Sequence, residues 1–340
     1  MKRRDFLLAS AAASACALTS SISTAWAAAS SNAASGADIA AWPNKPLRII
    51  NAYPPGGIVD ILARLVGAEL SQSLGQPVIV EDRPGAGGNI GTAYVARAAG
   101  DPYTLLLGAS GPLAINPSLY KNLGYDPVRD FTPISLLAAT PLVLVTGTKS
   151  GINSYAELMT HLKNAEQPPF YGSAGTGTPQ HLAGEMLKQK TGVKATHVAY
   201  KGGAPAVIAI IGGEVLYAFE NLALVQPHIQ AGRMKALAVS SPARTSQLPD
   251  VPTVAESGVK DFEARGWYGV LMPANMPPEI AKRLTDAVVK AAALPKVRGV
   301  IETFGSDNVS EGPQAFSALI ASEMVKWRGI IEAGNISLDG

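Results

Sequence analysis

Cysteine is almost absent from this chain of 340 residues, which contains only Cys16. Cys16 lies in an N-terminal segment that we expect to be removed, so the mature chain would have no cysteine. Disulfide bonds are thereby excluded as a source of stability. About 300 remaining residues are enough to bury the cores of two domains without covalent support.

Charge is also scarce: charged residues make up 16% of the chain, and the formal net charge is +2. Removal of residues 1–27 would take away three basic residues and one acidic residue, which brings the net charge to zero. A chain with no net charge has no excess of positive charge to attract nucleic acid or an anionic membrane surface. No apolar run after the N-terminal segment is long enough to span a bilayer.

Catalytic and cofactor motifs are missing as well. The segment Gly108-Ala109-Ser110-Gly111 is not the G-x-S-x-G turn of α/β-hydrolases, and no phosphate-binding G-x-x-x-x-G-K-[ST] loop occurs. The four histidines, at positions 161, 181, 197 and 228, lack the spacing of metal ligands. We therefore expect no catalytic residues, no metal and no cofactor. The alternative is an exported α/β hydrolase that uses Ser110 or Ser173 with His181.

The N-terminus has the layout of an export signal. Lys2, Arg3 and Arg4 precede a short apolar run, and Ala25-Trp26-Ala27 is a small-x-small cleavage site. The arginine pair followed by Asp5-Phe6-Leu7 matches the twin-arginine pattern, so residues 1–27 are predicted to be a twin-arginine signal peptide. Residues 28–41, rich in Ala, Ser and Gly, are predicted to be a flexible linker. The predicted location is the periplasm; lipid attachment at Cys16 is an alternative.

From Leu47 onward, short apolar runs alternate with helical patterns. This rhythm predicts an α/β fold of two units, each with a mostly parallel sheet covered by helices. The chain enters the second unit near Ala138–Val145 and returns near Phe262–Val270. Two crossings between two units make a hinge and a closing cleft. The predicted boundaries place residues 42–141 and 266–340 in lobe 1, and residues 142–265 in lobe 2.

Glycine-rich loops between strands and helices are the candidate binding elements. Tyr53–Gly57 leads into the first helix, Arg83–Gly91 follows the second strand, and Gly172–Pro179 leads into a helix capped by Thr178. Such loops expose backbone N–H groups beside the partial positive end of a helix, which favours an anion. Ordinary turns and caps remain the alternative for each loop.

Two further segments could contribute to a site. Tyr200-Lys201-Gly202-Gly203 joins a strand to a helix, and Glu220-Asn221 follows the strand predicted at Leu216–Phe219. An acidic side chain at the mouth of a cleft could bind a hydroxyl or amine of a ligand. A helix-capping role explains Glu220 equally well.

Taken together, several segments resemble the Bug family of extracytoplasmic receptors, the TctC-like solute-binding components of tripartite tricarboxylate transporters. The segments are Tyr53-Pro54-Pro55-Gly56-Gly57-x-x-Asp60, Glu81 to Gly91, Ala114 to Tyr120, Gly172 to Ala183, His197 to Pro205, Leu248 to Glu256 and Trp267-Tyr268-Gly269. The resemblance implies a two-lobed Venus-flytrap fold, type II, that holds a carboxylate through amides, hydroxyls and water.

By the same resemblance, the ligand contacts in this sequence would be Tyr53, Gly56, Gly57, Asp60, Gly88, Asn89, Ser110, Thr176, Gly177, Thr178, Tyr200 and Glu220. Three positions depart from the family pattern. Ile58-Val59 replaces a smaller pair, Glu220 stands where aspartate is common, and Gly111-Pro112 stiffens a loop that often carries a hydroxyl residue.

The sequence thus predicts a monomeric solute-binding receptor that is not an enzyme. Its partners would be a small organic acid and either the membrane subunits of a tripartite tricarboxylate transporter or a sensor kinase. Besides the hydrolase, a surface protein tethered through Cys16 is the alternative.

Overall fold

The computed structural model describes residues 39–306 and 310–338, and residues 43–340 form one compact unit. The predicted signal peptide, residues 1–27, and nearly all of the predicted linker lie outside the described residues. Within the described ranges, no helix is both long enough and apolar enough to cross a membrane.

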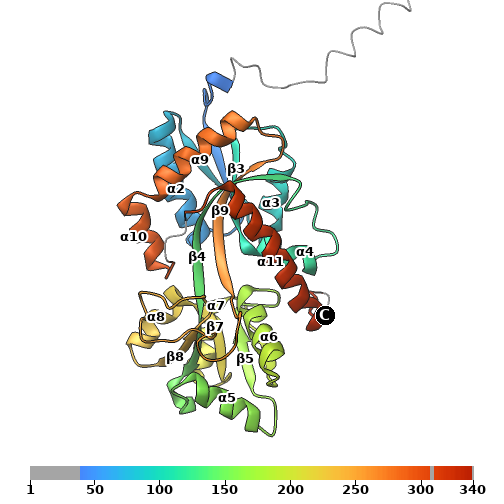
Figure 1. The fold of residues 1–340 in the computed structure, drawn as a ribbon, viewed down its shortest axis with the longest axis vertical. Helices are drawn as coiled ribbons and strands as arrows, with labels where there is room; N and C mark the ends of the chain where they lie inside the picture. Colours follow the sequence, from blue (N-terminus) through green and yellow to red (C-terminus); the bar gives the residue numbers. More distant parts are fainter. Residues whose placement is uncertain (1–38, 307–309, 339–340) are drawn as a thin grey trace, which may run out of the picture. The chain divides into compact units, whose positions relative to one another are not determined.

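Lobe 1 is built on three parallel strands in the order β2-β1-β3, of which β3 is labelled in Figure 1. Their bounds are β1 Leu47–Asn51, β2 Val78–Asp82 and β3 Thr104–Ala109. Beside β3 run β9 (Arg265–Pro273) and the first part of β4 (Phe131–Gly147), both antiparallel to their neighbours. The helices are α2 (Ile58–Leu74), α3 (Asn89–Ala96), α4 (Asn116–Leu119), α9 (Pro278–Ala292), α10 (Pro295–Thr303) and α11 (Pro313–Ala333).

Lobe 2 repeats the β/α pattern. Strands β5 (Phe170–Ser173) and β6 (Thr196–Ala199) are parallel, β7 (Tyr217–Asn221) is parallel to β5, and β8 (Met234–Val239) pairs with the far part of β4. Its helices are α5 (Tyr155–Asn164), α6 (Pro179–Thr191), α7 (Gly203–Gly212) and α8 (Leu222–Gln230). Helices α2 and α3 of lobe 1 and α5 to α8 of lobe 2 alternate with strands, as the sequence pattern predicted, whereas α9, α10 and α11 follow the last strand, β9.

Strand β4 belongs to both lobes. It pairs with β9 from Phe131 to Pro141, and from Leu142 it pairs with β7 and β8. At this change of partner, the Leu142 N–H donates to Ser240 Oγ at 2.8 Å, and Ser240 Oγ donates to the Ala264 carbonyl at 2.5 Å. The two strands that cross between the lobes are thus tied together at one point. The predicted two-lobed fold, with a hinge of crossing strands, is confirmed.

Helix ends follow the predicted caps. Ser154 Oγ accepts from the Glu157 N–H at 3.2 Å, while Glu157 Oε2 accepts from the Asn153 N–H at 2.7 Å. Helix α6 starts after Thr178 and ends at Gly192, whose φ of 73° lies in the left-handed region. These caps determine the residue at which each helix begins. They therefore determine where the preceding loops, which could bind a ligand, end.

Each lobe has a core of aromatic and aliphatic side chains. In lobe 1, Trp267 of β9 and Trp327 of α11 are both buried, and the Trp327 indole N–H donates to Glu323 Oε2 at 2.8 Å. In lobe 2, Phe219 stacks on Phe262 with ring centroids 5.6 Å apart. Burial of each such side chain stabilises the fold by about 1.5–3 kcal/mol, which replaces the missing disulfides.

Candidate functional site

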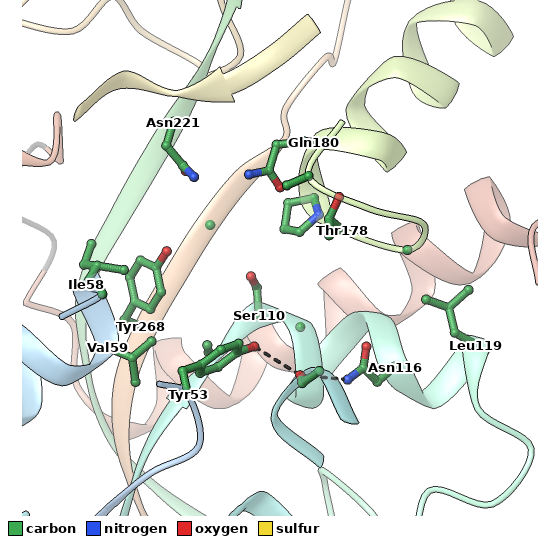
Figure 2. Close-up of a pocket in the computed structure, with 18 of the residues that line it drawn as sticks. Tyr53, Ile58, Val59, Ser110, Asn116, Leu119, Thr178, Gln180, Asn221 and Tyr268 are labelled. Atoms are coloured by element: carbon green, nitrogen blue, oxygen red, sulfur yellow. Dashed lines mark hydrogen bonds between the residues drawn. The ribbon is translucent and has the colours of Figure 1, made fainter. Parts of the chain in front are cut away.

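A cavity of about 510 Å³ lies between the lobes, a size typical of sites for small molecules. It is lined from lobe 1 by the loop before α2, the end of β3 and helix α4, and from lobe 2 by the loop before α6 and the end of β7 (Figure 2). Strands β4 and β9 cross behind it and contribute Leu142, Gly266 and Tyr268. The cavity therefore lies beyond the carboxyl ends of the parallel strands, where ligands bind in open α/β sheets.

The first lobe 1 wall is the loop Tyr53–Gly57. The Tyr53 N–H donates to Asn51 Oδ1 at 3.1 Å, and the Tyr53 hydroxyl donates to the Gly87 carbonyl at 3.2 Å. Gly56 has a φ of 89°, and its N–H donates to Asp60 Oδ2 at 2.9 Å. The Asp60 carboxylate is thus already used to fix the loop, and Arg64 Nε pairs with it at 2.7 Å.

Behind this wall lies a buried network of neutral polar side chains. Asn89 Oδ1 accepts from Asn116 Nδ2 at 2.7 Å and lies 2.9 Å from the Tyr125 hydroxyl. Asn116 Nδ2 also donates to the Gly87 carbonyl at 3.2 Å. Gly88 has a φ of 94°, and a Cβ there would come within 3.2 Å of the Tyr53 ring. Gly88 and Asn89 therefore hold the wall in place from behind rather than lining the cavity.

Ser110 directly follows β3 and faces the cavity (Figure 2). It is 3% exposed, and among the described residues no hydrogen bond is made by its hydroxyl. A π-helical turn follows at Gly111–Ile115, a rare geometry that is frequent at functional sites. The sequence predicted only a stiff loop here, because a π turn has no sequence signature of its own. The Ser110 hydroxyl is left available to a ligand.

The lobe 2 wall is the loop between β5 and α6. Gly175 and Gly177 have φ values of 136° and 76°, and the Thr178 hydroxyl donates to the Gly175 carbonyl at 2.7 Å. Thr178 Oγ1 also accepts from the His181 N–H at 3.3 Å, which caps α6. Pro179 at the first helical position has no N–H, so the Gln180 backbone amide is the first helical donor. This helix end carries partial positive charge toward the cavity.

Two histidines, the buried His181 and the half-buried His197, support that loop. The Gly177 N–H donates to His181 Nδ1 at 3.1 Å, so the ring proton of His181 is on Nε2. The His197 ring stacks on it with centroids 3.7 Å apart, and His197 Nε2 lies 2.6 Å from Ser173 Oγ. Burial lowers the pKa of His181 to about 3 and that of His197 to about 4. Both imidazoles are neutral at pH 7 and supply no positive charge to the site.

Glu220 lies inside β7 and is fully buried, whereas the sequence placed it after the strand, at the mouth of a cleft. Its Oε1 has no hydrogen-bond partner in the described part of the chain, and Oε2 accepts from the Asn221 N–H at 3.3 Å. Burial raises the Glu220 pKa to about 7, although the Asn221 N–H and the Gln180 side chain oppose the rise. Glu220 thus lies next to Asn221 and Gln180, which do line the cavity.

The structure divides the sequence-predicted contacts into two groups. Six line the interlobe cavity: Tyr53, Gly57, Ser110, Thr176, Gly177 and Thr178. Six are not among its lining residues: Gly56, Asp60, Gly88, Asn89, Tyr200 and Glu220. Some of the second group contact a lining residue: Asn89 Oδ1 accepts from Asn116 Nδ2, and Glu220 Oε2 accepts from the Asn221 N–H. The Tyr200 ring lies against Gly172, which is not among the lining residues. Sequence reasoning missed the lining residues Ile58, Leu119, Gln180, Asn221 and Tyr268 as contacts, since no local pattern marks a side chain as facing another lobe.

None of the side chains that line the cavity carries a charge. Within the described ranges, no group of histidine, cysteine and acidic side chains could hold a metal ion. The donors on offer are backbone N–H groups, hydroxyls and side-chain amides. Such donors suit an anion or a polar neutral group rather than a cation.

Comparisons with known proteins converge on one family. The family model described as "Tripartite tricarboxylate transporter family receptor" matches residues 62–336. The relative "Protein BugT" of Bordetella pertussis is 36% identical over 294 residues, which cover 85% of this chain and 89% of the relative. Two solved structures are also similar. "R. palustris Rpa4515 with adipate" is 32% identical, with a TM-score of 0.76, over 87% of this chain and 100% of that one. "MatC (Rpa3494) from Rhodopseudomonas palustris with bound malate" is 28% identical, with a TM-score of 0.72, over 85% and 100%.

Proposed function

This chain belongs to the tripartite tricarboxylate transporter family of receptors, and on that premise we propose that it captures a small carboxylate in the interlobe cavity. The main support for this proposal is that donors from both lobes face one another across the cavity. Ser110 of lobe 1 lies opposite Gln180 and Thr178 at the start of α6 in lobe 2 (Figure 2). Neutral donors from both lobes can then bind one carboxylate at the same time.

Closure of the lobes is the proposed mechanism. A ligand that bonds to both lobes favours the closed arrangement by its differential affinity for that state. Leu119 of lobe 1 lies against Gly177 of lobe 2, so the two walls also meet through apolar contact. We propose hinge boundaries at 141/142 and 265/266, beside the strand crossing where β4 changes partner.

The proposed binding residues act in two ways. Tyr53, Gly57, Ser110, Thr176, Gly177 and Thr178 contact the ligand directly from the cavity wall. The others act from behind that wall: Gly56, Asp60, Gly88, Asn89, Tyr200 and Glu220.

The proposed setting follows from the family. The protein is exported by its twin-arginine signal, residues 1–27, and works as a monomer in the periplasm. It delivers its ligand to the membrane subunits of a tripartite transporter or reports it to a sensor kinase. The relatives that contain adipate and malate support a carboxylate as the ligand.

The test is a thermal-unfolding screen of the mature protein against a panel of carboxylates, because a bound ligand raises the unfolding midpoint in proportion to ln(1 + [L]/Kd). The Ser110→Ala variant should bind the best acid at least tenfold more weakly, since it loses a hydrogen bond to a charged group. Ser322→Ala is the matched control, because Ser322 is exposed on α11. A panel that shifts no midpoint would contradict the proposal.

The hydrolase alternative has one observation in its favour, the 2.6 Å contact between Ser173 Oγ and His197 Nε2. Ser173 is fully buried, however, and is not among the residues that line the cavity. Its hydroxyl also accepts from the Gly175 N–H at 3.1 Å, so it serves the loop. We propose a receptor without catalysis. A serine-directed phosphonate should leave the protein unlabelled, and labelling of Ser173 or Ser110 would favour the hydrolase.

A further inference from the structure

Ser110, Thr178 and Gln180 lie at the centre of the interlobe cavity, and apolar side chains predominate at its two ends (Figure 2). Ser110 lies opposite Gln180 and Thr178 in the middle, while Leu119 lies at one end and Ile58 at the other (Figure 2). Asn116, beside Leu119, already donates to Asn89 Oδ1 and to the Gly87 carbonyl. The Leu119 end therefore offers a ligand little hydrogen bonding from side chains.

The Ile58 end is mainly apolar and has acidic neighbours. Ile58, Val59 and the ring of Tyr268 line it, and the polar groups at this end are the Asn221 side-chain amide and the Tyr268 hydroxyl (Figure 2). The charged groups nearest in sequence are both acids: Asp60 directly follows Val59, and the buried Glu220 directly precedes Asn221. Asp60 is paired with Arg64, and Glu220 has no cationic partner among the described residues. A ligand carboxylate at this end would lose its hydration without gaining a cation, which costs free energy.

A second cavity of about 370 Å³ continues past the same end. It shares Gly57, Ile58, Asn221 and Tyr268 with the first cavity. Beyond them it is lined by Gly56, Thr140, Ala223, Leu224 and Phe304. The space past Ile58 is thus mostly apolar and contains no charged side chain in its lining.

We infer that the solute of this receptor is a monocarboxylate with an apolar body. Its carboxylate binds between Ser110 and the start of α6, and its body lies along Ile58 and Tyr268 toward Leu224 and Phe304. The inference rests on the proposed function, because it assumes that the interlobe cavity binds a carboxylate. It separates this chain from receptors that hold a dicarboxylate, since a second carboxylate would meet mainly apolar walls, and no cationic side chain in the lining, at either end.

Hexanoate and adipate are the two ligands that test the inference. They have the same length, but hexanoate ends in a methyl group where adipate has a second carboxylate. Isothermal titration of the mature protein should give a hexanoate Kd at least tenfold below that of adipate. Octanoate should bind more tightly than hexanoate, by about fourfold for each added methylene that is buried. Tighter binding of adipate would overturn the inference and leave the proposed function standing. Absence of binding by every carboxylate in the panel would overturn the proposed function.

Two substitutions test where the apolar body of the ligand lies. Ile58→Ser should weaken octanoate at least fivefold and change acetate affinity less than twofold, because acetate has no body to place. Leu119→Ser should weaken octanoate and acetate by the same factor, because Leu119 acts through its contact with Gly177 of the other lobe and not on the body of the ligand. A loss of octanoate relative to acetate that is seen only in Leu119→Ser would overturn the assigned direction. Ile208→Ser is the matched control, since Ile208 is 69% exposed on α7. The unfolding midpoint of each variant without ligand shows whether that variant folds.

Discussion

The two lobes hold their halves of the cavity wall by different chemistry. In lobe 1, the wall rests on Asn89, Asn116 and Tyr125, neutral groups that bond to one another. In lobe 2, it rests on the stacked imidazoles of His181 and His197, one of which accepts from the Gly177 N–H. An amide network keeps its hydrogen bonds at any ordinary pH. An imidazole acceptor is lost once it is protonated. The comparison teaches that acid should remove a hydrogen bond from the lobe 2 loop and leave the amide network of lobe 1 intact.

The largest effect is expected where the walls meet, at Gly177. A Cβ at this position would overlap Leu119 Cδ1 of lobe 1, and the φ of 76° disfavours any side chain. Gly177→Ala should therefore weaken ligand binding by roughly a hundredfold, measured by titration calorimetry, and lower stability by about 1–3 kcal/mol.

Gly192→Ala is the control for that variant. Gly192 has a φ of 73°, and nothing lies within 4 Å of a Cβ built there. It should lose similar stability, by about 1 kcal/mol, and keep its ligand affinity. Equal affinities for Gly177→Ala and the wild type would show that the two walls do not meet through this contact.

The acid sensitivity of lobe 2 is the second prediction. The folded-state pKa values of His181 and His197, about 3 and about 4, lie below the ordinary value of 6.5. Below pH 6.5 the unfolded chain binds protons that the folded chain excludes. Stability should therefore fall as the pH drops from 6.5 toward 4, by up to about 1.4 kcal/mol per pH unit for each histidine.

Urea unfolding at pH 7, 6, 5 and 4 measures this slope in the wild type and in His181→Asn. The Asn side-chain oxygen can still accept from the Gly177 N–H, and it does not titrate in this range. The slope should become smaller in His181→Asn and remain unchanged in His161→Asn, since His161 is exposed on α5. An unchanged slope in His181→Asn would refute the assignment of acid sensitivity to this ring.

Local signals in the sequence predicted much of the fold. Thr178, Pro179 and Gly192 mark the two ends of α6 because capping depends on residues next to each other. In the region of β4 the sequence predicted only the crossing into the second unit near Ala138–Val145, although the strand runs from Phe131 to Gly147. Pro133 suggests a break, because proline cannot donate to a sheet. In the structure, the pairing with β9 shifts between Pro133 and Ser135.

The candidate site shows the same limit. The loop Gly172–Pro179 could be found from its glycines and the following cap, and it does line the cavity. Gln180 and Asn221 could not be found in this way, because facing the other lobe depends on how the two lobes are joined. The stacked ring pair His181–His197 joins α6 to β6, and nothing in the intervening residues encodes a contact of 3.7 Å.

The third prediction concerns the neutral network of lobe 1. Asn89→Ala removes the acceptor of Asn116 Nδ2, and a buried donor left without a partner costs about 1–3 kcal/mol. Ligand affinity should fall about tenfold, because the Gly87 carbonyl and the Tyr53 ring lose their support. The loss should be the same at pH 5 and pH 8, measured by titration calorimetry. Asn164→Ala, on the exposed end of α5, is the control. A loss of ligand affinity seen only at acid pH would contradict the proposed difference between the two lobes.

The smallest effect is expected at Glu220, which titrates in the opposite sense to the histidines. Its folded-state pKa, about 7, lies above the ordinary value, so the folded chain holds a proton that the unfolded chain releases. The stability that this proton contributes is present below pH 4.5 and is lost as the pH rises through 7.

Glu220→Gln keeps the shape of the side chain without its charge. The variant should be more stable than the wild type at pH 8 by about 1 kcal/mol. That difference corresponds to a rise in Tm of roughly 2–4 °C in thermal unfolding. At pH 5 the two proteins should melt together, because the wild-type carboxyl is then protonated. A rise in Tm at pH 5 equal to that at pH 8 would show that the gain comes from packing, and that the buried carboxylate of lobe 2 carries no pH-dependent cost.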